Sequence, residues 1–317
     1  MRHLHLRALP ALLAAALLVA TGCGQPSPAP TPPPAPAIDG EALMTVVRML
    51  AAPEMEGRGA GTPGGLRARA FVLERLQATG LEPVGDGFQL PFQFPARADG
   101  AITDGVNLAA RCAGTAPEAP VIVVSAHYDH LGVRDGEVYH GADDNASGVA
   151  VLLALAAACR EAPFHHTVIF VAFDAEEHGL RGARAFVESP PVPRERIALN
   201  VNLDMVSRGD TGELYAAGTH HTPALRAPLE AVAARAPVAL RFGHDRPEDG
   251  SNDWTMQSDH GPFHEAGLPF IYFGVEDHPD YHRPTDTVDR IDVAFFTAAA
   301  TTILDALRAL DTALAGR

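Results

Sequence analysis

The sequence predicts an α/β fold, and two observations support this prediction. Apolar runs typical of buried strands occupy residues 121–127 and 166–174. Each run is followed by a longer segment with helical periodicity, at residues 147–161 and 180–189. Strands and helices therefore alternate along the middle of the chain, which is the pattern of a sheet covered by helices.

Further elements are expected on both sides of this alternation. Helical patterns precede it, and two more apolar runs and a long apolar helix follow it. The sequence shows no internal repeat and no second domain, so we expect residues 39–317 to form one domain. The expected helices are 40–52, 63–79 and about 293–314, and the expected strands are 88–94, 105–110, 197–205 and 269–275.

The first 22 residues are expected to be an export signal rather than part of the fold. Arg2 and Arg7 precede an apolar run, residues 8–20, that is too short for a comfortable membrane span. The run leads into ATGC, which resembles a bacterial lipobox, so Cys23 is expected to carry a lipid. An ordinary cleaved signal is the alternative, because Ala20 stands where a lipobox usually has leucine, and a buried N-terminal helix is a weaker one.

A proline-rich linker is expected at residues 23–38. Its segment GQPSPAPTPPPAPA contains seven prolines and no charge, so it favours an extended polyproline helix that cannot pack. We therefore expect an exported, membrane-anchored lipoprotein that faces the periplasm or the cell exterior and meets the membrane only through its lipid; secretion is the alternative. The other two thiols, Cys112 and Cys159, can form a disulfide in an exported chain or remain buried and free.

The composition argues against a nucleic-acid partner and excludes one type of covalent catalysis. The formal net charge is -15 and the chain has no lysine, so a nucleic-acid partner is not expected, because phosphate binding relies on clustered basic residues. Schiff-base chemistry through lysine is excluded as well. The hydrophobic share of 47% over 317 residues is enough to bury a substantial core.

Chemically reactive side chains gather where the predicted strands end, which is where open α/β sheets bind ligands. The segment VIVVSAHYDH, for example, ends in His127, Asp129 and His130. Imidazoles mixed with carboxylates favour zinc or a related ion, whereas an all-oxygen set would indicate calcium or magnesium. The candidate metal and catalytic set is His127, Asp144, Glu176, Glu177, Asp204 and His282.

Six short motifs in order resemble a known family: AHYDH, GADDNASG, FDAEEHGLRGA, NLDM, SDHGPF and YHRPTDT. This set resembles the secreted bacterial di-zinc aminopeptidase family, whose superfamily includes aminopeptidase Y, glutamate carboxypeptidase II and glutaminyl cyclase. It covers roughly residues 45–300, and GRGAGTPG at 57–64 is similar to the family's N-terminal element. The resemblance implies a single catalytic domain of zinc exopeptidase type: a three-layer sandwich with a central mixed, mostly parallel twisted sheet.

The resemblance also implies two zinc ions per chain and their ligands. Asp144 aligns with the carboxylate that bridges both metals; His127 and Asp204 complete one site, and Glu177 and His282 complete the other. A bridging carboxylate can hold two cations about 3.5–4 Å apart. Its neighbour in GADDNASG, residue 143, is expected to have no ligand role, and similar enzymes suggest a cis peptide bond beside Asp144.

Three further residues receive roles. Glu176 is expected to be the general acid/base, because successive side chains at a strand end diverge and only one of the two glutamates can bind metal. Asp129 is expected to hold the imidazole of His127 in its metal-binding tautomer. Asp259 is expected either on the substrate side of the site or behind the metal ligands as their partner, and His260 is expected to be structural.

The function that this set implies is an exopeptidase that removes N-terminal residues from peptides with a free N-terminus. Alternatives are a carboxypeptidase or dipeptidase of the same superfamily, a cyclase-like acyltransferase, and a surface domain of the same fold without catalysis. The retained DDNASG motif argues against the cyclase, and the complete ligand set argues against the surface domain. Six further histidines are expected on the surface or in loops: His165, His166, His220, His221, His244 and His278.

Overall fold

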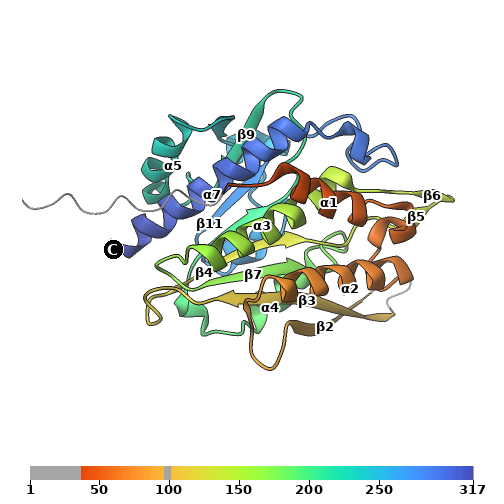
Figure 1. The fold of residues 1–317 in the computed structure, drawn as a ribbon, viewed down its shortest axis with the longest axis horizontal. Coiled ribbons are helices and arrows are strands. Elements are labelled where there is room, and N and C mark those ends of the chain that lie inside the picture. The colour runs from red at the N-terminus through yellow and green to blue at the C-terminus, as the bar shows by residue number, and fades with distance from the viewer. Residues whose placement is uncertain (1–36, 96–100, 317) are drawn as a thin grey trace, which may run out of the picture. The chain divides into compact units, whose positions relative to one another are not determined.

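The computed structural model describes residues 37–95 and 101–316. The predicted export signal, Cys23 and the linker up to residue 36 lie outside these described residues. All described residues belong to one compact unit (Figure 1), which confirms the expectation of a single domain.

A mixed sheet forms the centre of this unit, with strand order β1-β3-β7-β4-β8-β11-β9-β10 and β2 paired with β3. The central strands β7, β4, β8 and β11 are parallel. Antiparallel pairs β3–β7 and β11–β9 flank them, and β9 and β10 pair in parallel at one edge, so the predicted mixed sheet is confirmed. The strands are β1 (Glu82–Pro83), β2 (Gln89–Pro95), β3 (Ile102–Cys112), β4 (Val121–His127), β7 (Val168–Phe173), β8 (Ile197–Leu203), β9 (Glu213–Ala217), β10 (Ala239–Phe242) and β11 (Phe270–Gly274), with a separate hairpin of β5 (Val133–Arg134) and β6 (Glu137–Val138).

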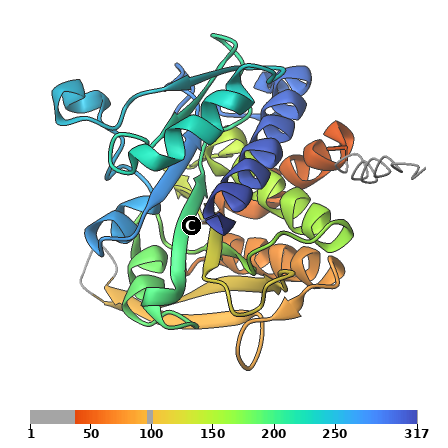
Figure 2. The same cartoon turned by 90° about the vertical axis from the view of Figure 1, so that its left-hand side faces the viewer.

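Helices cover both faces of the sheet, which gives the predicted three layers. Along β4, Ile122 and Val124 join the core beneath α1, α2, α3 and α7, whereas Val121 and Val123 join the core beneath α4 and α6. This alternation follows from the opposite directions of successive strand side chains. Figure 2 shows α1, α3 and α7 on the same side of the strands. The helices are α1 (Gly40–Leu50), α2 (Pro63–Ala78), α3 (Gly148–Glu161), α4 (Arg181–Glu188), α5 (Arg226–Ala233), α6 (His260–Glu265) and α7 (Val293–Ala315).

Local sequence explains several helix boundaries. Thr62 Oγ1 accepts a hydrogen bond from the Gly65 amide at 3.2 Å, and Pro63 occupies the first helical position of α2. Asp292 accepts from the amides of residues 294 and 295 at the start of α7. The predicted elements therefore agree with the observed ones to within a few residues.

The segment between β8 and β11 contains elements that the sequence did not reveal. It forms β9, α5, β10 and α6, where no strand or helix was expected. Strand β10 has only four residues and lies at the sheet edge beside β9, and α5 and α6 have eight and six residues. Such short elements give too few periodic positions for a pattern to be recognised.

A disulfide joins Cys112 at the end of β3 to Cys159 near the end of α3. The alternative of two free thiols is therefore not what the structure shows. Two segments, Ala142–Glu161 and Val293–Ala315, are long and apolar enough to span a membrane by composition. Core packing accounts for the first of them, because 89% of its apolar window is buried inside the unit.

Candidate metal and active site

Three parallel strands end at one place on the sheet. Strand β4 ends at His127, β8 ends just before Asp204, and β7 is followed by the turn that carries Glu176 and Glu177. Carboxyl ends of parallel strands meet at one edge, so these side chains converge as the sequence predicted.

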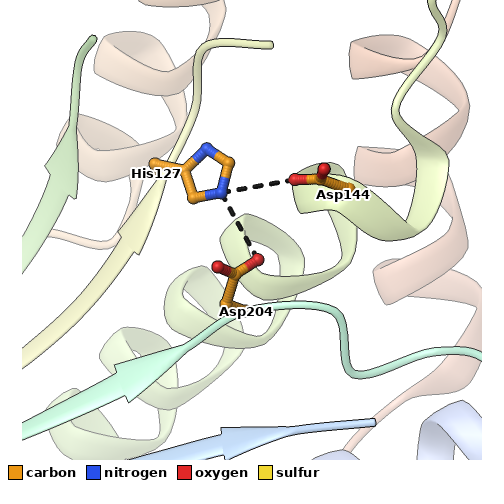
Figure 3. Close-up of side chains that lie close together, drawn as sticks. All are labelled: His127, Asp144 and Asp204. Carbon is orange, nitrogen blue, oxygen red and sulfur yellow. Dashed lines mark hydrogen bonds and ion pairs between the residues drawn. The ribbon is translucent and has the colours of Figure 1, made fainter. Parts of the chain in front are cut away.

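The first group of donors is His127, Asp144 and Asp204 (Figure 3). His127 Nε2 lies 3.4 Å from Asp144 Oδ1 and 3.3 Å from Asp204 Oδ1. All three residues are buried. The other oxygen of Asp204 accepts a hydrogen bond from Ser258 Oγ at 2.7 Å, which leaves Oδ1 aimed at the imidazole.

A second group forms around the other oxygen of Asp144. Asp144 Oδ2 lies 3.0 Å from His282 Nε2, which is also 3.5 Å from Glu177 Oε1. His130 Nδ1 lies 2.9 Å from the same glutamate oxygen and 3.7 Å from Asp144 Oδ2. His130 was not among the expected ligands, although it ends the motif AHYDH.

These donors fit metal ions. The two oxygens of Asp144 face different groups, as a bridging carboxylate requires. Glu177 Oε1 and both ring nitrogens of His130 are buried and have no hydrogen-bond partner within the described part of the chain. Buried polar atoms normally have partners, so orphaned imidazole and carboxylate atoms around one point indicate an ion site of zinc type.

The turn that carries Asp144 is held by its own network. It is η2 (Ala142–Ser147), and the peptide bond between Asp144 and Asn145 is cis, as the resemblance suggested. Gly141 has a left-handed φ of 58°, and a Cβ there would overlap the carbonyl oxygen of Asp144. The carboxylate of Asp286 accepts hydrogen bonds from the amides of Asp143 and Asp144, all at 3.1 Å.

Asp143 points away from the metal donors and joins two other loops. Its Oδ1 accepts from the amide and hydroxyl of Ser207 at 2.8 and 2.6 Å. Its Oδ2 lies 3.2 Å from His278 Nε2. His278 lies in a loop, which is one of the two expected alternatives, but it is buried against this carboxylate rather than exposed on the surface. His166 is likewise buried, against Asp311.

Arg58 is the largest fully buried side chain in this region. Its guanidinium donates hydrogen bonds to the carbonyls of Tyr128, Leu50, His140, Gly141 and Asp144. The motif GRGAGTPG, which lies far away in the sequence, thus ties the end of β4 to the turn that presents Asp144.

Asp129 departs from its expected geometry. His127 Nδ1 lies 3.2 Å from the backbone carbonyl of Asp129 and 3.8 Å from its carboxylate. The carboxylate instead accepts from the amides of Glu176 and Glu177 at 3.0 and 3.4 Å. The backbone carbonyl therefore orients the imidazole, and the side chain fixes the turn that carries both glutamates.

The electrostatics of the carboxylates differ. Burial opposes ionisation of Asp144, but three surrounding imidazoles outweigh it and hold its pKa well below the usual range. Burial and Asp144 raise the pKa of Glu177, yet His130 and His282 lower it to about 2. Burial raises the pKa of Glu176 well above its ordinary value, although the imidazole of His127 opposes this.

A cavity of about 380 Å³ opens onto both groups. Its polar lining includes Glu176, and Tyr281 stacks on His282 with ring centroids 4.0 Å apart. Asp259 is fully buried and is not among the described residues that line the cavity; burial raises its pKa to about 7. The lining residues are His127, Asp144, Glu176, Glu177, Gly179, Leu180, Arg184, Asp204, Met205, Met256, Gln257, Tyr281 and His282.

Comparison with known proteins identifies the family. Residues 107–307 match Peptidase family M28. The chain belongs to this family. Aminopeptidase YwaD of Bacillus subtilis (strain 168) is 33% identical over 183 residues, which cover 54% of this chain and 37% of YwaD. The probable lipoprotein aminopeptidase LpqL of Mycobacterium tuberculosis is 32% identical over 207 residues, covering 56% of this chain and 40% of LpqL.

The M28 assignment agrees with the fold. An aminopeptidase from Aneurinibacillus sp. strain AM-1 has a similar structure, with a TM-score of 0.69 at 18% identity, covering 85% of this chain and 93% of that one. This M28 chain spans less than half the length of YwaD and LpqL. The family match begins at residue 107, so Arg58 lies outside it. His130 lies inside it, and treating every histidine of AHYDH as a candidate ligand would have added His130 to the predicted donor set.

Proposed function

We propose that the chain is an aminopeptidase with two zinc ions that removes N-terminal residues from peptides. One observation carries this proposal: Asp144 places one oxygen in each of two donor groups, and Glu176 lines the cavity that opens onto both. Membership of peptidase family M28 supports it.

The roles of the residues follow from their positions. Bound zinc would acidify a water molecule and polarise the scissile carbonyl. Glu176 takes a proton from the attacking water and passes it to the leaving amine, a role typically worth ~10²- to 10⁴-fold in rate. Asp144 would bridge the two ions; His127 and Asp204 would bind one, and Glu177 and His282 would bind the other.

The charge of the cavity supports a substrate with a free N-terminus. Glu176 lines this cavity and is not assigned to a metal ion, so its carboxylate is available to an ammonium group rather than to a substrate carboxylate. Asp259 is proposed to lie behind this surface on the substrate side, because it is buried next to Ser258, which donates a hydrogen bond to Asp204.

Hydrolysis of leucine p-nitroanilide and of its N-acetylated counterpart tests the proposal. We expect cleavage of the free-amine substrate only, lost with a chelator and restored by added zinc. Cleavage of neither substrate by folded protein that holds two zinc ions would exclude leucine aminopeptidase action and favour carboxypeptidase or dipeptidase specificity. Folded protein that binds no metal would contradict the proposal altogether.

We also propose that the chain is exported and anchored through a lipid on Cys23. The disulfide supports export, since such bonds persist in oxidising compartments. The relative LpqL is named as a lipoprotein, which supports the anchor. Cys23→Ser is expected to release the protein from membranes into the soluble fraction, and unchanged partitioning would refute the anchor.

A further inference from the structure

We propose that His130 is a direct ligand of the second metal ion, which then has four protein donors where the first has three. The inference rests on the proposed function, because it needs two metal sites that share Asp144. It adds a residue to the set of five ligands that the motifs predict.

The distances among the four donor atoms carry the inference. In a tetrahedral zinc site with bonds of 2.0–2.1 Å, neighbouring donors lie about 3.3 Å apart. In the second group, Glu177 Oε1 lies 2.9 Å from His130 Nδ1 and 3.5 Å from His282 Nε2. Asp144 Oδ2 lies 3.7 and 3.0 Å from the same two nitrogens. These four of the six edges scatter around the tetrahedral value, and His130, Asp144 and Glu177 offer donor atoms that all lie within 4.8 Å of one another.

The orientation of His130 favours a metal ligand over a hydrogen-bond donor. Its Nδ1 is close enough to Glu177 Oε1 for a hydrogen bond, but the pair does not form one, and both atoms are without a hydrogen-bond partner within the described residues. A donor that served only to position Glu177 would point its N–H at the oxygen. Two atoms that approach each other without bonding suit a shared ion between them.

Burial adds a second argument. The His130 side chain is fully buried, whereas 40% of the His282 side chain is exposed. An imidazole with two unpaired nitrogens in a closed interior costs free energy unless something binds it. The carboxylates of Asp144 and Glu177 lie within 4 Å of Nδ1, so a cation bound to Nδ1 satisfies that nitrogen and both carboxylates, while Nε2 keeps no hydrogen-bond partner among the described residues.

The first group is different in number. His127, Asp144 and Asp204 form it, and the distances from His127 Nε2 to the two carboxylates are 3.4 and 3.3 Å. Three donors leave one tetrahedral position open, as in catalytic zinc sites, whereas four protein donors are typical of closed sites. The second ion is therefore the more firmly held.

The experiment counts zinc ions by elemental analysis in the full-length protein, with free zinc held low by a competing chelator. The wild-type protein is expected to retain two ions, and fewer would refute the two-metal function itself rather than this inference. His282→Ala is expected to retain two, because Asp144, Glu177 and His130 still hold the second ion. His130→Ala with His282→Ala is expected to retain one.

Two results would overturn the inference. One is a single ion in His282→Ala, and the other is two ions in the double variant. The ion kept in the first group shows in each case that the variant is folded. His140→Gln is the matched control, since its Nδ1 bonds the carbonyl of Ala51 in the same region, and it is expected to retain two ions.

Cobalt(II) substitution gives an independent readout that does not depend on affinity. The visible absorption of cobalt reports only the atoms bound to it. His130→Ala is expected to change the bands of the cobalt-loaded protein, whereas His140→Gln leaves them as in the wild type. An unchanged spectrum in His130→Ala would show that the imidazole is outside the coordination shell.

Discussion

The two donor groups share Asp144 but differ in how they are completed. The first group adds two buried residues from the ends of β4 and β8, and its cavity side faces Glu176. The second adds Glu177 from the turn after β7 and two imidazoles, of which His282 is partly exposed. The first group, which shares the cavity with the proposed base Glu176, thus has three donors, and the second group has four.

This difference suggests a division of labour between the ions. An open position beside Glu176 allows a water molecule and a substrate carbonyl to approach. In the proposed two-zinc enzyme, a more completely enclosed second ion would add positive charge without exchanging its own ligands. Variants that affect one donor group and spare the other test whether the two groups differ in this way.

The largest effect is expected from Glu176→Gln. It removes the proposed proton carrier, so kcat/KM is expected to fall by ~10²- to 10⁴-fold while both groups keep their zinc. Steady-state kinetics with elemental analysis of the same sample measures this. Glu41→Gln, at an exposed position of α1, is the control. Near-normal turnover in the zinc-loaded variant would remove Glu176 from this role.

The next largest effect separates the groups directly. Asp204→Ala leaves the first group with two donors, whereas Glu177→Ala leaves the second with three if His130 binds. Zinc affinity is expected to fall in both variants. In Asp204→Ala the loss is expected to exceed the ~10- to 100-fold typical of removing a residue that hydrogen-bonds a metal ligand. In Glu177→Ala the loss is expected to be smaller than in Asp204→Ala.

Chelator competition ranks the two variants. Asp86→Ala, an exposed aspartate, serves as the control and is expected to bind zinc as the wild type does. Equal losses in the two metal-site variants would mean that the groups do not differ in donor number. Full wild-type affinity in Glu177→Ala would show that this residue is not a ligand.

A third, smaller effect is expected from His278→Ala. His278 contacts the carboxylate of Asp143, and Asp143 is adjacent to the shared Asp144. His278 also belongs to the loop that carries His282. Its loss is expected to weaken zinc binding about 10-fold, mainly in the second group, as for an outer partner. Isothermal calorimetry tests this, with His244→Ala as control. A loss larger in the first group would contradict it.

The sequence predicted the central strands and the site-bearing turns because both depend on local patterns. Buried strands such as residues 121–127 are continuous apolar runs, and the polar residues after them fall at the sheet edge by topology alone. Sequence patterns were therefore sufficient to bring the two glutamates, Asp144 and Asp204 together at one site.

The remaining features depend on distant contacts. His278 is buried because Asp143 meets it across 135 positions of sequence, and Arg58 finds carbonyls of residues as far away as Asp144. His130 carries no periodic signal, since only the turn after β4 directs it toward Glu177. The strands β9 and β10 are short and rely on neighbours in the sheet rather than on their own sequences.

The smallest effect on the two groups is expected from removing the disulfide by Cys112→Ser and Cys159→Ser. The cysteines are 47 residues apart, so their loss is expected to lower the free energy of unfolding by about 4 kcal/mol through the entropy of the unfolded chain. The bond lies at the far end of α3 from Asp144, so zinc affinity and its ranking between the groups should not change. Denaturant unfolding of the zinc-loaded protein, followed by chelator competition, measures both quantities. A selective loss of one ion in this variant would show that the difference between the groups depends on the anchoring of α3 and not on their donors.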